Sequence, residues 1–211
     1  MRVVPKIACF VALLALAVSG ACAASTAGTL TCVGLYSETS DGYVSFRQVG
    51  KADWKVMKVG DVIPADAEIK INVDRDWVEL IATGSPNAVY EIDGPQSGEI
   101  VKKVSDVLKS KARSVSFPKG TASSPDSKFK DKVVVVQYLG RQINMTKDGD
   151  SLDIKYGMVL DSTAKVKIIG INNTINLMNA SGAVTQVIGP LNFNIADVLS
   201  NKNLYKFLNV Q

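Results

Sequence analysis

The sequence predicts a mainly β protein, all-β or α+β, made of two similar small β units that are each followed by a short amphipathic helix. Three observations predict this: runs that alternate apolar and polar residues, Gly-containing turns between them, and a second occurrence of the same pattern later in the chain. The predicted organisation is a signal peptide over 1–23, a first unit with its helix over 30–113, a linker over 114–132 and a second unit with its helix over 133–211.

The N-terminal stretch is typical of an export signal. Arg2 and Lys6 precede a short apolar run over 7–18, and Ala21-Cys22-Ala23 fits cleavage before Ala24. The apolar run is shorter than the roughly 20 residues that a membrane-spanning helix needs. The alternative is lipidation: Ser19-Gly20-Ala21-Cys22 is similar to a bacterial lipoprotein box, which makes Cys22 a candidate lipid attachment site.

Charge and cysteine content limit the possible functions. The signal holds two of the 24 Lys and Arg residues and none of the 20 Asp and Glu residues, which leaves a net charge of +2. Nucleic-acid binders concentrate basic charge on one surface, so we expect no nucleic-acid partner. Cys32 stands alone after the signal, so we expect it to be a small buried hydrophobe.

One pattern of residues occurs twice. "VGDVIPADAEIKI" at 59–71 returns as "YGMVLDSTAKVKI" at 156–168, with Gly60 matching Gly157. Farther along, a Gly-Pro pair follows the last strand of each copy, at Gly94 and Gly189. It ends that strand, because Pro cannot donate to a strand ladder. Intermediate matches keep the apolar phase: Val62 with Val159, Ile69 with Val166, Lys70 with Lys167, Val78 with Ile175 and Leu80 with Leu177. The sequence therefore predicts an internal duplication.

Strands are expected wherever the period is two. An opening hairpin precedes each Gly turn, and three alternating runs follow it in each copy. The runs are 68–73, 77–82 and 89–92 in the first copy, and 165–171, 174–178 and 185–188 in the second.

A helix is expected after each Gly-Pro. Over 98–114, Ile100, Val104, Val107 and Leu108 share one face at helical spacing, and a second helix is expected within 193–210. These helices either pack on a sheet or, because Lys residues fill the other face of the first, touch anionic lipid or a partner. Between the copies, 114–132 is rich in Ser, Lys, Pro and Gly, which predicts a linker.

At this point a resemblance can be stated. "KVGDVIPADAEIKINVDRDWVELIATG" resembles the FecR-type periplasmic domain, with its Gly-Asp turn followed by strands of alternating residues. The resemblance covers about 43–95 and, more weakly, 133–190, where Met158 replaces the Asp. It implies an extracytoplasmic β domain that contacts proteins or glycans. In the regulator that names the family, such a domain signals to a cytoplasmic anti-sigma segment, and only its extracytoplasmic role is expected here.

Catalysis is not expected. The chain has no His, which removes Ser-His-Asp and Cys-His pairs and the commonest transition-metal ligand. No phosphate-binding or dinucleotide-binding motif is present, so we expect no cofactor and no metal. A pair of carboxylates could still perform acid–base chemistry. The carboxylates of the first copy, Glu79 among them, fall at turns or on the polar phase of strands, which predicts solvated positions.

The predicted function is therefore that of an exported bacterial cell-envelope protein, periplasmic or extracellular, that binds protein or glycan or serves as a scaffold. The alternatives are a lipid-anchored surface lipoprotein and a periplasmic signalling component. Trp77 beside Arg75 is a candidate surface contact, since Trp77 takes the phase opposite to Val78. Burial of Trp77 against the following helix fits the sequence equally well.

Overall fold

The structure, a computed structural model, describes residues 28–36, 44–74, 76–140, 143–147 and 150–200. Within these ranges the chain is mainly β, as predicted, with three sheets and two short helices. The predicted signal peptide over 1–23 and Cys22 lie outside the described residues. None of the helices in the described ranges has the length and apolar character needed to cross a membrane.

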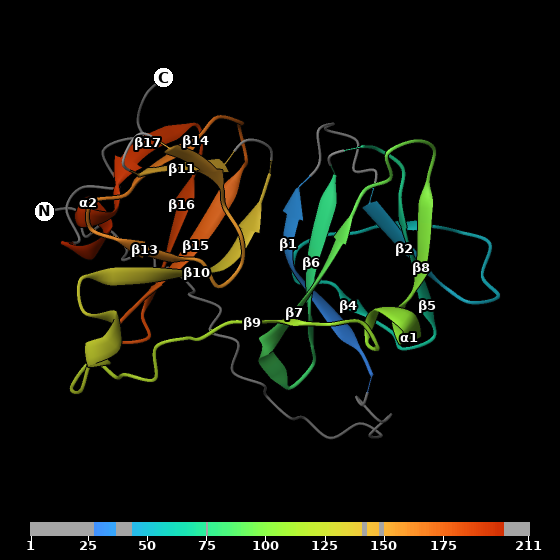
Figure 1. The fold of residues 1–211 in the computed structure, drawn as a ribbon, viewed down its shortest axis with the longest axis horizontal. Coiled ribbons are helices and arrows are strands. Elements are labelled where there is room, and N and C mark those ends of the chain that lie inside the picture. Colours follow the sequence, from blue (N-terminus) through green and yellow to red (C-terminus); the bar gives the residue numbers. More distant parts are fainter. Residues whose placement is uncertain (1–27, 37–43, 75, 141–142, 148–149, 201–211) are drawn as a thin grey trace, which may run out of the picture.

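A nine-stranded sheet runs through both halves of the molecule, which lie side by side (Figure 1). Its path is β16-β15-β10-β1-β6-β7-β9, with β4 paired to β1 and β13 paired to β10. The central pairing, β1 with β10, is parallel, with Gly34 opposite Tyr138, and it joins the halves. The strands are β1 (Leu30–Tyr36), β4 (Val62–Ile63), β6 (Trp77–Ala82), β7 (Ser85–Asp93), β9 (Arg113–Ser114), β10 (Lys132–Leu139), β13 (Val159–Asp161), β15 (Thr174–Asn179) and β16 (Val184–Ile188).

Each half adds a four-stranded antiparallel sheet whose apolar side packs into the core of that half. A helix follows the last strand of each and buries two apolar side chains. The sheet of the first half contains β3 (Lys55–Val56), β2 (Val44–Gln48), β5 (Ala67–Ile71) and β8 (Ile100–Lys103), followed by α1 (Val104–Val107). The sheet of the second contains β12 (Asp150–Asp153), β11 (Ile143–Lys147), β14 (Lys165–Ile168) and β17 (Leu191–Asn194), followed by α2 (Ile195–Leu199).

Each half contains the same kind of backbone hydrogen bond at a matching position. The Gly60 N–H donates to the Cys32 carbonyl at 2.8 Å, and the Gly157 N–H donates to the Val135 carbonyl at 2.7 Å. The pairings β1–β6 and β10–β15 each carry one register shift, just after these carbonyls. Both glycines have positive φ, 92° and 74°, which glycine adopts at little cost. These matches support the predicted duplication, which itself stays a prediction.

The helix predicted over 98–114 is confined to Val104–Val107. Residues 100–103 form β8 instead, because Ile100 lies opposite Ile71 of β5 and completes the sheet. The pairing satisfies the backbone groups of this segment as well as a helix would, and it also buries part of Ile100. The continuation of the second predicted helix over 201–210 lies outside the described residues.

The segment predicted as a linker packs closely against the protein. Val115 and Phe129 are buried, each with 8% of its surface exposed, and Val115 joins the core of the second half. The Val115 N–H donates to the Asn87 carbonyl at 2.9 Å, which continues the β9–β7 pairing. The segment also contains a short 3-10 helix, η1 (Ser127–Phe129). Residues 114–117 therefore fasten the first half to the second.

Candidate functional site

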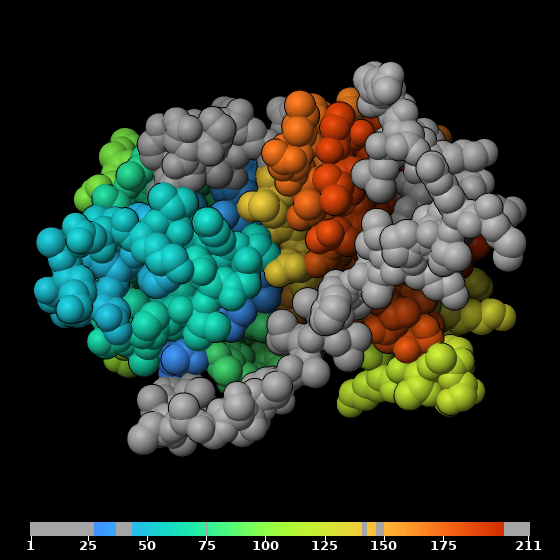
Figure 2. Space-filling view, turned by 180° about the vertical axis from the view of Figure 1, so that it is seen from behind, coloured from blue at the N-terminus to red at the C-terminus, as the bar shows by residue number. Residues whose placement is uncertain are grey.

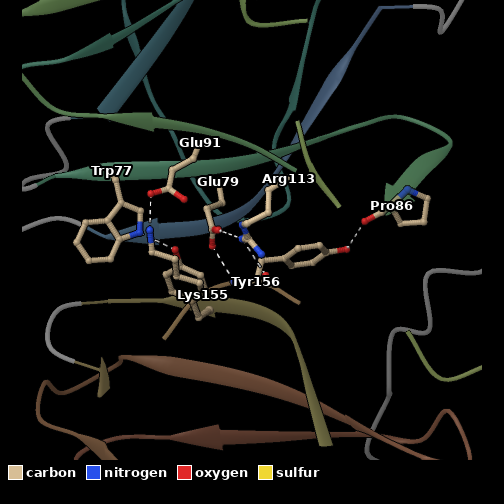
Figure 3. Close-up of polar contacts among 8 residues, drawn as sticks. Trp77, Glu79, Pro86, Glu91, Arg113, Lys155 and Tyr156 are labelled. Carbon is tan, nitrogen blue, oxygen red and sulfur yellow. Dashed lines mark hydrogen bonds and ion pairs between the residues drawn. The ribbon is translucent and has the colours of Figure 1, made fainter. Parts of the chain in front are cut away.

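A polar cluster forms where the halves meet (Figure 3). On the first half, Glu79 lies opposite Glu91 and Trp77 lies opposite Asp93, so these side chains share one face of the β6–β7 pair. That face points toward the second half. We call the cluster the junction, and its members are Tyr36, Trp77, Glu79, Glu91, Arg113, Tyr138, Lys155 and Tyr156.

Glu79 is the centre of the junction. Its side chain is fully buried, although the sequence pattern predicts a solvated position, and this prediction is wrong for Glu79. One carboxylate oxygen accepts a hydrogen bond from the Tyr156 backbone N–H at 2.7 Å, and the other forms an ion pair with Arg113. Arg113 also donates to the Tyr156 carbonyl at 3.0 Å. Arg113 therefore links β6 to the second half through one side chain.

Burial raises the pKa of Glu79 above its ordinary value, while the Tyr156 N–H, the Tyr138 hydroxyl and the Arg113 charge act to lower it. Both carboxylate oxygens are occupied and none of the side chain is exposed. A general acid or base must come within hydrogen-bond reach of its substrate. Glu79 is therefore placed to hold the halves together rather than to act on a molecule from solution.

Trp77, the predicted contact residue, is half-buried in the junction. Its ring stacks on Tyr36 with the centroids 3.8 Å apart, and its Nε1–H donates to the Tyr138 hydroxyl at 2.7 Å. Lys155, which pairs with Glu91, lies 5.9 Å from the Trp77 ring. Arg75 lies outside the described residues, so a Trp77–Arg75 contact surface stays a prediction.

Cys32 lies in the core of the first half, as predicted, with none of its surface exposed. Burial raises the pKa of its thiol far above the ordinary value, so the reactive thiolate is suppressed. In the part of the chain that the structure describes, no group of three or more His, Cys, Asp or Glu residues is arranged to hold a metal ion.

A second cluster covers the outer face of the β3-β2-β5-β8 sheet. The Trp54 ring lies 4.4 Å from the Arg47 guanidinium carbon and 4.6 Å from the Lys70 ammonium nitrogen. Strand pairing sets the neighbours of these groups in two rows across the sheet. We call this surface the Trp54 face, and it comprises Trp54 with one row of Val56, Ser45, Lys70 and Val101 and a second row of Arg47, Glu68 and Lys103.

Exposure shows where the indole of Trp54 lies. Ser45 points outward from β2, yet only 7% of its surface is exposed, and only 19% of the Lys70 side chain is exposed. The indole covers this part of the sheet while part of its own surface remains open to solvent. The position of Trp54 over this sheet is hard to predict from the sequence, because Trp54 precedes a strand of only two residues. The one available signal is the run of polar residues at alternate positions of β2 and β5.

Comparison of the chain with protein-family models, with curated proteins and with solved structures finds no match in any of the three. The resemblance to the FecR-type domain therefore stays a prediction.

Proposed function

We propose that the protein is an exported cell-envelope protein that binds an envelope component without catalysing a reaction. The observation that carries this proposal is the Trp54 face, where an aromatic ring, exposed valines and cations gather on an open sheet. Trp is enriched at binding surfaces because it offers a large contact area with few rotatable bonds to fix, and Arg because its planar guanidinium donates several hydrogen bonds and stacks on rings. Export rests on the signal-like residues 1–23.

The junction supports a binding role in a different way. It joins the two β halves through the Tyr156 N–H bond to Glu79, the Arg113 bond to the Tyr156 carbonyl, the Lys155–Glu91 ion pair and a shared sheet. A rigid body holds a binding surface in one geometry, so less entropy is lost when a ligand is bound.

The test is co-sedimentation of the purified chain with the insoluble envelope fraction of bacterial cells. We expect the wild-type chain to sediment with the fraction and Trp54→Ala to stay in solution. Lys167→Ala is the matched control, since Lys167 takes the place of Lys70 in the sheet of the second half and its neighbour there is Asn192 rather than Val101. Thermal unfolding of each variant verifies folding. Equal sedimentation of Trp54→Ala and wild type would contradict the proposal.

A further inference from the structure

We propose that the Trp54 face binds a carboxylate-bearing glycan, with a sugar ring on the indole and the sugar carboxylate between Lys70 and Lys103. This inference rests on the proposed function and names its ligand class. It combines three features of one surface: an apolar platform, cations beside the platform, and their restriction to the first half.

The platform combines an aromatic ring with aliphatic side chains. The indole lies over the middle strands, and two valines flank it on the outer strands, Val56 with 46% and Val101 with 42% of its surface exposed. Sugar rings present a flat layer of C–H groups, which pack on aromatic and aliphatic side chains. A partly exposed aromatic side chain with adjoining exposed apolar surface marks a contact site, whereas single scattered apolar residues do not.

Cations beside the platform are available for an acidic ligand. Lys70 reaches Glu99 only at 3.9 Å, and 59% of the Glu99 side chain is exposed, so this pair exchanges easily with a ligand carboxylate. Lys103 lies diagonally across the β5–β8 pairing from Lys70, because Lys70 is opposite Val101 and Glu68 is opposite Lys103. Lys103 is therefore a near neighbour of Lys70, whose ammonium nitrogen lies over the Trp54 ring, 4.6 Å from its centroid. Lys103 forms no ion pair with any residue that the structure describes.

Arg47 plays a different part, because its charge is already compensated. Its Nη2 lies 3.0 Å and its Nε 3.1 Å from the same Glu68 oxygen, and the Glu68 side chain is 17% exposed. Arg47 thereby positions the indole by a cation–π contact and leaves ligand recognition to the two lysines.

The second half lacks this surface. Where Val101 faces Lys70, Asn192 faces Lys167, and the described strands of that sheet contain no tryptophan. We therefore expect one glycan site per chain.

Binding is measured by titrating the Trp77→Phe chain, in which Trp54 is the only remaining tryptophan, while following fluorescence. The probes are a short oligomer of galacturonic acid and the neutral oligomer of galactose, which lacks only the carboxylates. We expect the acidic oligomer to change the Trp54 emission with one site per chain and to bind about tenfold more tightly than the neutral one. Added salt should weaken the acidic oligomer selectively.

The variants Lys70→Ala and Lys103→Ala should each weaken the acidic oligomer about two- to fivefold, while Lys167→Ala leaves its affinity unchanged. Equal affinity for the neutral oligomer would overturn the role of the carboxylate. Binding of a polyglutamate peptide in place of both oligomers would overturn the glycan assignment. If neither oligomer binds but the chain still sediments with the envelope fraction in a Trp54-dependent way, this inference fails and the proposed function stands. If sedimentation is also lost, both fail.

Discussion

Glu79 joins the two halves by accepting from the Tyr156 backbone N–H and by pairing with Arg113, which also donates to the Tyr156 carbonyl. Glu79→Ala leaves the Tyr156 N–H and the Arg113 guanidinium without this partner, so we expect a loss of about 2–4 kcal/mol in the free energy of unfolding. Glu79→Gln keeps the shape and one acceptor and should cost less. Urea unfolding measures both.

The control is Glu91→Ala, which removes a partly exposed ion pair with Lys155 and should cost less than about 1 kcal/mol. Equal losses in Glu79→Ala and Glu91→Ala would mean that burial of Glu79 carries no special weight.

The pH dependence of stability follows from the same residue. Burial raises the pKa of Glu79 above 4.5, so the folded chain binds this proton more tightly than the unfolded chain. As pH falls from neutral through the raised folded pKa, a charge penalty disappears. The wild type should then gain stability relative to Glu79→Gln, which does not titrate. Urea unfolding of both chains at about pH 7 and about pH 4.5 measures the difference. A relative loss at the lower pH would show that Arg113 depresses the pKa instead.

The local sequence could not predict that Glu79 is buried. Glu79 alternates correctly with Val78 and Leu80, so the pattern assigns it to a polar face. That face is covered by residues 113–117 and 154–156, and contacts so distant in sequence leave no local signal. The burial of Trp77 is ambiguous in the sequence for the same reason, since its partner Tyr138 belongs to the other half.

At the scale of elements, β9 and the residues after it connect the two halves. Val115 packs directly over Gly157, where an added Cβ would lie 2.3 Å from Val115 Cγ1. We expect Val115→Ala to lower the free energy of unfolding by about 1–3 kcal/mol, because it removes buried methyl groups and leaves a cavity. The control is Val62→Ala, where 58% of the residue surface is exposed and the expected change is within about 0.5 kcal/mol. If the segment around Val115 were a freely moving linker, the two variants would lower the free energy of unfolding equally.

Most strands could be predicted, because β5, β6, β14 and β15 alternate clearly over four to six residues. β8 could not. Ile100, Val104 and Val107 fit helical spacing, and only the partner strand β5 makes the extended conformation the better one for 100–103. Tertiary pairing thus overrides a local helical pattern.

At the scale of the whole molecule, the shared sheet and the junction predict a single cooperative unfolding transition. Figure 2 shows the two halves in broad contact from the side opposite to Figure 1. Both tryptophans belong to the first half and Trp77 also contacts Tyr138 of the second, so fluorescence follows the first half and the junction while far-UV circular dichroism follows all strands. The two urea unfolding curves should coincide. A circular dichroism curve with a second transition at a different urea concentration would show that the halves unfold separately.

The duplication stays a prediction from the sequence, and the arrangement of the two halves could not be predicted from it. The pattern favours two small units with a spacer, whereas the structure merges one sheet of each unit through β1 and β10. Gly34 permits this approach, because a Cβ there would lie 2.4 Å from the Tyr138 ring. A glycine inside an apolar strand does not show, from the sequence alone, which side chain will pack against it.

The parallel pairing of β1 with β10 also has a consequence for synthesis of the chain. Ribosomes add about 5–20 residues per second, so several seconds separate the appearance of β1 from that of β10. During that interval, the edge of β1 near Gly34 has no partner from its own second half. Another newly made copy can supply β10 in its place, since an exposed strand edge accepts any matching strand. Rapid overproduction should therefore yield exchanged dimers, in which each chain completes the first half of its neighbour.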